Sequence, residues 1–235
     1  MGIFNFNIAT SFAVSVARLG AGMNAAKADI HADKEPLIVY EFEACPYCRK
    51  VREALTELNL DAEIRPCPKK GSRFRPALAQ QAGKEQFPYL IDPNTGWEGY
   101  ESTDIVKYLF NTYGNGRRPG ILIGGNPLAI VNGTFSSALR PTYGWQHQAS
   151  NAPDKLLELY SFEASPFCRI VREKLCELEI PYLLHNVGKG SPSRPAFIER
   201  SGKMMVPYLI DPNTDTEMFE SADIVQYLED TYSAK

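Results

Sequence analysis

EFEACPYCRK occupies residues 41–50, and SFEASPFCRI occupies residues 161–170. The similarity extends beyond these stretches, since 13 of the 19 residues in 40–58 are identical to those in 160–178. Each stretch joins an apolar, β-rich run to a proline, and apolar residues at helical spacing follow the proline. This pattern predicts, in both copies, a buried strand that leads directly into a helix.

The repeat continues toward the end of each copy. PYLIDPNT at 88–95 returns whole at 207–214, and ESTDIVKYL at 101–109 corresponds to ESADIVQYL at 220–228. A repeat of this length indicates a duplicated domain rather than a solenoid module, because each copy holds enough apolar residues for a core of its own.

Each copy predicts the same order of elements, β-α-β-α-β-β-α. In the first copy we expect strands at 37–42, 62–65, 88–91 and 97–100, and helices starting at Pro46, near 73 and near 103. This order is typical of the thioredoxin fold. The sequence therefore predicts an α/β protein made of two tandem thioredoxin-like domains.

The predicted organisation has three parts. Residues 1–113 hold a leading helix and the first domain, whose core is 36–113; residues 114–156 form a linker, and residues 157–235 form the second domain. In the linker, TFSSALRP (134–141) resembles the leading segment, so we expect a helix there too. The first 28 residues favour an amphipathic helix with Phe12, Val16 and Leu19 on one face, and an organelle-targeting peptide is the alternative.

Composition narrows the function. The 235 residues carry a net charge of −3, which argues against nucleic-acid binding. No apolar run approaches the roughly 20 residues of a transmembrane helix. Five cysteines, an odd number without a disulfide framework, favour a reducing compartment, and we expect the chloroplast or the cytoplasm.

The first copy contains a CxxC pair, Cys45 and Cys48. A cysteine between a strand and a helix gains a lowered pKa from the helix amides, and a second cysteine one turn later can close a disulfide. The alternatives are a zinc site and inert packing. Zinc would need a second ligand pair, and only Cys67 is near in sequence, so we expect redox chemistry and no metal.

CPYC followed by Arg49 resembles the dithiol site of glutaredoxins, and each copy resembles the N-terminal, glutathione-binding domain of glutathione S-transferases over about 75 residues. The resemblance implies that glutathione is the co-substrate and that disulfides or glutathionylated proteins are the substrates. It also implies which residues would bind glutathione: Tyr47, Phe87, Pro88, Glu101 and Ser102. The Phe87–Pro88 bond would be cis, as would Val206–Pro207 in the second copy, and an ordinary trans proline at an edge strand is the alternative. Glu101 would hold the ammonium of glutathione, and Ser102 would hold a carboxylate. The alternative is that Ser102 simply caps the helix.

In the second copy serine replaces the first cysteine. Ser165 resembles the serine of serine-type transferases, whose hydroxyl holds the glutathione thiolate, and a serine cannot carry out disulfide exchange. The site residues implied there are Ser165, Cys168, Val206, Pro207, Glu220 and Ser221. The second domain is therefore either a glutathione-binding site without redox chemistry or a degenerate copy kept for packing. We expect Cys168 to be half buried and inert.

Two departures from these families matter. Glutaredoxin-like sites commonly carry a lysine shortly before the first cysteine, whereas Phe42 and Glu43 stand here. Glu43 should raise the pKa of Cys45 if it points inward, unless Arg49 compensates or Glu43 faces solvent. Transferases also add an all-helical C-terminal domain, and a second thioredoxin-like unit takes that place in this chain.

These observations predict a glutathione-dependent thiol–disulfide oxidoreductase in which Cys45 attacks and Cys48 resolves. Two alternatives stay open: a transferase or isomerase that uses glutathione, and a non-enzymatic glutathione-binding or scaffold protein. Fold alone does not choose among them.

Overall fold

The computed structural model describes residues 2–25, 27–31, 33–124, 140 and 142–234. The first half contains α1 (Gly2–Ala17), β1 (Leu37–Glu41), α2 (Pro46–Leu58), β2 (Ala62–Pro66), α3 (Arg75–Ala82), β3 (Tyr89–Asp92), β4 (Trp97–Gly99) and α4 (Ser102–Tyr113). The second contains β5 (Leu157–Ser161), α6 (Pro166–Glu177), β6 (Tyr182–Asn186), α7 (Arg194–Ser201), β7 (Tyr208–Asp211), β8 (Thr216–Phe219) and α8 (Ser221–Tyr232). From β1 and β5 onward, this is the predicted order of a thioredoxin-like fold, twice.

Helix α2 shows why the quoted stretch folds as it does. Cys45 is the N-cap, and Pro46 follows in the first turn, where the missing N–H of proline costs nothing. Val51, Leu55 and Leu58 are fully buried, which confirms the apolar face read from their spacing. Helix α6 repeats this arrangement one copy later.

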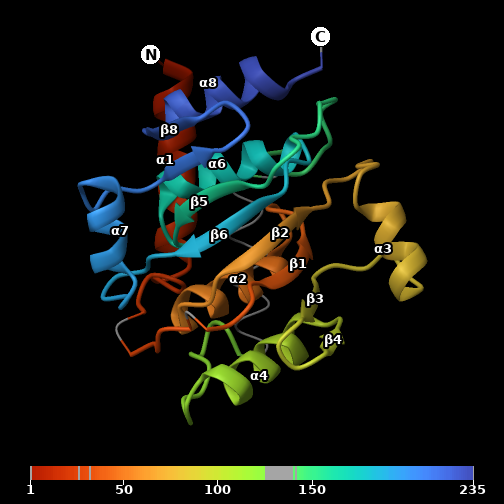
Figure 1. The fold of residues 1–235 in the computed structure, drawn as a ribbon, viewed down its shortest axis with the longest axis vertical. Coiled ribbons are helices and arrows are strands. Elements are labelled where there is room, and N and C mark those ends of the chain that lie inside the picture. The colour runs from red at the N-terminus through yellow and green to blue at the C-terminus, as the bar shows by residue number, and fades with distance from the viewer. Residues whose placement is uncertain (1, 26, 32, 125–139, 141, 235) are drawn as a thin grey trace.

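All eight strands belong to one sheet, in the order β4-β3-β1-β2-β6-β5-β7-β8 (Figure 1). The halves meet where β2 and β6 pair antiparallel, with Ala62 opposite Leu184 and Ile64 opposite Tyr182. This pairing satisfies two strand edges that would otherwise be exposed. Each half has the predicted fold, but the expected separate cores are joined: one buried apolar cluster contains residues of both halves.

Helices cover both faces of this sheet. Helices α2, α4, α6 and α8 lie over the shared cluster, where α2 packs on α4 and α6 packs on α8. On the other face, Leu78 of α3 packs on Tyr40 and Tyr89, and Phe197 of α7 packs on Tyr208. The N-termini of α2 and α6 therefore lie at the ends of β1 and β5, beside the boundary between the halves.

Helix α1 confirms the predicted leading helix, but its buried face differs from the prediction. Phe12, Val16 and Leu19 are exposed, at 58%, 57% and 79%. The buried side instead carries Ser11 and Ser15, because α1 packs on α6 of the second half through small residues and hydrogen bonds. Ser11 Oγ donates to the carbonyl of Pro166 at 2.8 Å.

The leading segment and the linker cross over between the halves in matching ways. The N–H of Ala164, in the second half, donates to the carbonyl of Gly22 at 3.1 Å. In the same way, the N–H of Ala44, in the first half, donates to the carbonyl of Gly144 at 3.3 Å. Each half is therefore held by the segment that precedes the other. The helix expected at 134–141 lies outside the described residues, apart from Arg140.

Gly144 gives a first prediction. Its φ is +63°, and a Cβ there would lie 2.7 Å from Cβ of Glu43. Gly144→Ala is expected to lower the free energy of unfolding by more than about 1 kcal/mol, because backbone strain and overlap act together. Urea unfolding measures the loss. Gly116→Ala is the matched control, since Gly116 has φ +79° but no neighbour within 4 Å of the added carbon. An equal loss in both variants would contradict a tight linker contact.

Candidate functional site: the CPYC helix terminus and its serine copy

Cys45 and Cys48 lie together at the N-terminus of α2. Both are free thiols, and Cys45 Sγ accepts a hydrogen bond from the N–H of Cys48 at 3.3 Å. Cys45 is 4% exposed and Cys48 is fully buried, so any reagent reaches Cys45 first. Tyr47, between them, is exposed.

The two thiols differ in acidity. Burial opposes ionisation of Cys45, but hydrogen bonds from the Cys48 thiol and from the N–H groups of Cys48 and Tyr47 hold the pKa of Cys45 below its ordinary value. Burial, together with the Cys45 sulfur, raises the pKa of Cys48 well above the ordinary value. Cys45 is therefore the thiol of this pair that ionises more readily.

Glu43, the acid expected to disturb Cys45, faces the boundary between the halves. Its side chain is buried and pairs with Arg52 at 3.3 Å and with Arg172 of the second half at 3.2 Å. Glu43 is therefore not solvated. Arg49 is directed to Glu163 of the second half, at 3.7 Å, rather than to the thiols.

Six charged side chains are buried together at this boundary, and we call them the interface ion cluster: Glu41, Glu43, Arg49, Arg52, Glu163 and Arg172. Burial alone would raise the pKa of Glu163, but Arg172 and Arg52, at 2.7 and 2.9 Å, lower it to about 2. For Glu41, burial outweighs its pairing with Arg52 and raises the pKa to about 7. Glu43 and Glu163 stand two residues before Cys45 and Ser165, and the ion pairs Glu43–Arg172 and Arg52–Glu163 connect the two halves there.

The loop before β3 carries the predicted cis peptide bond between Phe87 and Pro88, and the second half has its equivalent between Val206 and Pro207. Both cis predictions are confirmed. The ring of Phe87 lies 6.1 Å from that of Phe42, at an angle of 87°. These rings place an aromatic wall beside the CPYC turn.

Two residues of this wall were missed in the sequence. Trp145, in the linker, packs its ring 5.5 Å from that of Phe42, and the Arg75 guanidinium lies 4.6 Å from the ring of Phe87. Trp145 lies outside both repeats, so no motif pointed to it. Arg75 has a counterpart, Arg194, in the second copy, and this repetition was the available signal.

Glu101 and Ser102 lie where α4 begins. Glu101 is the exposed N-cap with φ 65°, and Ser102 is the buried first residue of the helix. Glu101 accepts a hydrogen bond from Gln86. The N-cap position is occupied by Glu101, whose side chain makes no capping hydrogen bond, and Ser102 lies one residue inside the helix. Glu220 and Ser221 repeat this arrangement at the start of α8.

Ser165 occupies the position of Cys45 almost unchanged. Its backbone angles are φ −70° and ψ 120°, against −71° and 121° for Cys45, and its Oγ accepts from the N–H of Cys168 at 3.3 Å. Cys168 is fully buried rather than half buried, because it lies under the first turn of α6. The two turns therefore share one backbone geometry and differ in the side-chain atom at the N-cap, which is sulfur in Cys45 and oxygen in Ser165.

A cavity of about 770 Å³ opens beside Ser165. Ser165 and Val206 line it together with apolar side chains of α1 and of the SPFC turn: Ile8, Ala9, Phe12, Phe162, Pro166 and Phe167. Glu220 and Ser221 are not among the lining residues. The structure therefore brings only part of the predicted second site to this cavity, and Ser165 is the one polar side chain in its wall.

Within the described residues, no group of three or more His, Cys, Asp or Glu side chains is arranged to hold a metal ion. No helix in the same part of the chain has the length and apolar character needed to cross a membrane.

Thiol labelling tests the assignment of the nucleophile. Iodoacetamide near neutral pH is expected to modify Cys45 before any other cysteine, because its pKa is lowered, whereas burial raises that of Cys48, Cys67 and Cys176. Mass spectrometry of peptides from a labelling time course gives the order. If Cys48 or Cys67 is labelled first, the roles assigned to the two thiols are wrong.

Comparison with known proteins gives a family. The model of the glutathione S-transferase N-terminal domain matches residues 39–118 and again residues 159–235, together more than half of the chain. Among solved structures, the Bombyx mori glutathione transferase BmGSTD1 is 24% identical, with 41% of this chain and 43% of that chain covered and a TM-score of 0.31. The match thus spans less than half of the Bombyx mori enzyme.

A second solved structure is TDR1, a trimeric glutathione transferase of Leishmania. It is 14% identical, with 86% of this chain and 68% of that chain covered and a TM-score of 0.29. No curated protein matches the sequence of this chain.

Proposed function

The chain belongs to the glutathione S-transferase N-terminal domain family, and from this membership we propose that it is a glutathione-dependent thiol–disulfide oxidoreductase. One observation carries the proposal: Cys45, with a lowered pKa, caps a helix one turn before a second thiol. The helix N-terminus stabilises a thiolate, and a thiolate is the species that attacks disulfides. The activity is assigned to the first half.

The reaction follows from the order of the thiols. The Cys45 thiolate attacks the glutathione sulfur of a glutathionylated protein; the S–S bond breaks, and the protein leaves as a thiolate that takes a proton from water. A second glutathione, as its thiolate, attacks the glutathione now bonded to Cys45. This step releases glutathione disulfide and restores the Cys45 thiolate.

A protein disulfide would use both cysteines. After Cys45 has formed a mixed disulfide with the substrate, the Cys48 sulfur attacks the Cys45 sulfur, and the Cys48 proton passes to the departing thiolate. The Cys45–Cys48 disulfide is then reduced by two molecules of glutathione, which leave as glutathione disulfide. This cycle requires a reducing compartment, for which we propose the chloroplast or the cytoplasm.

The residues around the thiols suit glutathione as the co-substrate. The backbone of Phe87, before the cis bond, would pair with the cysteinyl part of glutathione. Glu101, exposed at the start of α4, would hold the ammonium, and Ser102 with the N-terminus of the helix would hold the neighbouring carboxylate. In the second half, Glu220 and Ser221 offer the same anchor without a reactive sulfur.

Reduction of the mixed disulfide of β-mercaptoethanol and glutathione tests the proposal. Glutathione disulfide is the product, so NADPH oxidation by added glutathione reductase is expected to rise in proportion to the protein. A redox titration should give a reduction potential of about −200 to −230 mV, the range of glutaredoxins. No turnover of the mixed disulfide would overturn the proposal, and a value near −270 mV would indicate a different electron donor.

One observation favours a second candidate, glutathione transferase chemistry in the second half. The Ser165 hydroxyl can donate to a glutathione thiolate, and the adjoining apolar cavity has the size of a small-molecule site. Conjugation of 1-chloro-2,4-dinitrobenzene that survives Cys45→Ser and is lost in Ser165→Ala would establish it. The absence of such conjugation leaves the second half as a binding site or a degenerate copy.

A further inference from the structure

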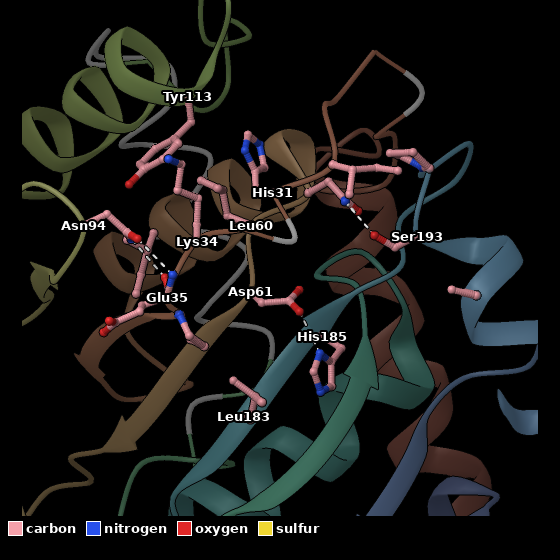
Figure 2. Close-up of a pocket in the computed structure, with 16 residues that line it drawn as sticks. His31, Lys34, Glu35, Leu60, Asp61, Asn94, Tyr113, Leu183, His185 and Ser193 are labelled. Carbon is pink, nitrogen blue, oxygen red and sulfur yellow. Dashed lines mark hydrogen bonds and ion pairs between the residues drawn. The ribbon is translucent and has the colours of Figure 1, made fainter.

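A second cavity lies at the opposite end of β1 from the CPYC turn (Figure 2). Its volume is about 320 Å³, and both halves line it, so we call it the seam cavity. Residues 30–31 and 34–37, before and at the start of β1, form one side, and β6 with the segment before α7 forms the other. Five residues of strand, about 16 Å, separate it from Cys45, so it is a different site.

The seam cavity has an apolar floor. Leu37 and Leu60 are almost fully buried there, and Leu183 of β6 extends this surface into the second half. Tyr113, at the end of α4, adds an aromatic face, with its ring 5.5 Å from the ring of His31. A bound molecule would therefore keep an apolar group against these residues.

Charged groups of opposite sign stand on two sides of this floor. His31 and Lys34 belong to one turn, closed by a hydrogen bond from the N–H of Lys34 to the carbonyl of His31. Asp61 and His185 lie across from them, at the junction of β2 and β6 (Figure 2). The arrangement offers the Lys34 ammonium, which also pairs with the exposed Asp33 at 3.4 Å, on one side and the Asp61 carboxylate on the other.

Two of these groups have capacity left for a ligand. His31 Nε2 is buried and has no hydrogen-bond partner among the described residues, which is a costly state for a polar atom. Asp61 is held in place by His185 Nδ1 at 2.7 Å and by the N–H of Asn186 at 3.1 Å, yet its side chain is 41% exposed. A carboxylate offers about four acceptor positions, so Asp61 can still accept from an ammonium.

We propose that the seam cavity binds a free α-amino acid with an apolar side chain. Lys34 and His31 hold the carboxylate, Asp61 holds the ammonium, and the side chain lies on Leu60 and Leu183. The volume supports this size, because about 320 Å³ is at the lower end of the range for small-molecule sites. The site does not depend on the chemistry of Cys45.

Calorimetric titration of the full chain with L-leucine and L-phenylalanine tests the site. At least one of them is expected to bind. N-acetyl-leucine, which lacks the ammonium, and leucine methyl ester, which lacks the carboxylate, should bind at least about tenfold more weakly, as expected when a hydrogen bond between charged groups is lost. No binding of either amino acid, or a derivative that binds as tightly as leucine itself, would overturn the proposal.

Variants locate the binding. Lys34→Gln removes an exposed ammonium and should weaken binding at least about tenfold, and Ala196→Phe, at the edge of the cavity on α7, should abolish it by filling the space. Lys155→Gln is the control, because Lys155 lies in the segment before β5 and does not line the cavity, and this variant should bind as the wild type does. Binding unchanged in Ala196→Phe would place the amino acid elsewhere. Cys45→Ser should retain it, which separates this site from the proposed redox function.

Discussion

Cys45→Ser is expected to reduce the glutathione-dependent activity to the rate of the uncatalysed reaction and to leave the fold intact. The physical reason is chemical, since a serine hydroxyl does not exchange with disulfides. The fold should survive because the chain already contains this substitution: Ser165 caps α6 with backbone angles within one degree of those of Cys45. The measurement is turnover of the glutathione mixed disulfide, with circular dichroism as the check on folding.

Cys48→Ser separates the two roles. A glutathione mixed disulfide needs only the attacking thiol, because free glutathione resolves the intermediate, so this variant should retain turnover of that substrate. Reduction of a protein disulfide should fall, because the resolving thiol is gone. Cys176→Ser, at a buried position outside the site, is the control for loss of any thiol. Full turnover of the glutathione mixed disulfide by Cys45→Ser would contradict the mechanism.

The serine copy allows the reverse experiment. In a Cys45→Ser background, Ser165→Cys places a thiol at a helix terminus with the same geometry, beside the cis bond before Pro207. If the second half keeps a glutathione groove, this variant gains iodoacetamide labelling at position 165 and measurable exchange. If it is labelled but gains no exchange, the second half is a structural copy, and the binding role of Ser165 should be dropped.

The sequence predicted the local structure well, because the repeat reports the same local constraints twice. The strand, the proline and the apolar spacing of 51, 55 and 58 led directly to β1 and α2, and the family resemblance of the repeated Pro-Tyr-Leu-Ile-Asp segment led to the cis bonds. These features depend on residues near one another in the chain. The same holds for Cys45 and Cys48, whose roles follow from one helix turn.

What the sequence did not predict depends on how the two copies meet. The pairing of β2 with β6 joins the cores, and nothing in either copy alone specifies that partner. The effect of Glu43 was predicted from its closeness in sequence to Cys45, whereas its ion-pair partner Arg172 is 129 residues away. The repeat did contain a signal for these ion pairs. Both copies carry Phe-Glu-Ala before the site and Val-Arg-Glu after it, and the glutamates of the first motif pair with the arginines of the second at the boundary.

The interface ion cluster gives the largest expected effect on stability. Glu163→Gln should lower the free energy of unfolding by about 3–5 kcal/mol, because it leaves the buried guanidinium groups of Arg52 and Arg172 short of a counter-charge. Urea unfolding at neutral pH measures this. The halves share one core, so we expect the loss in a single transition.

The pH dependence of this effect has a definite sign. The folded protein lowers the pKa of Glu163 to about 2, below its ordinary value of 4.5. An acid whose pKa is lowered by folding contributes stability that is present above about pH 4.5 and is lost as the pH falls toward 2. The difference between the wild type and Glu163→Gln should therefore be largest near neutral pH and shrink in acid. A difference that grows in acid would contradict the assignment.

Glu41 is the control that reverses the sign. Burial raises its pKa from 4.5 to about 7, so its contribution is present below about pH 4.5 and is lost as the pH rises through 7. Glutamine resembles the protonated acid and can still accept from Arg52. Glu41→Gln should therefore match the wild type near pH 4 and exceed its stability at pH 8, by up to about 3 kcal/mol. Two acids that contact the same arginine thus predict opposite outcomes, because Glu163 lies between Arg52 and Arg172, whereas Glu41 pairs with Arg52 alone.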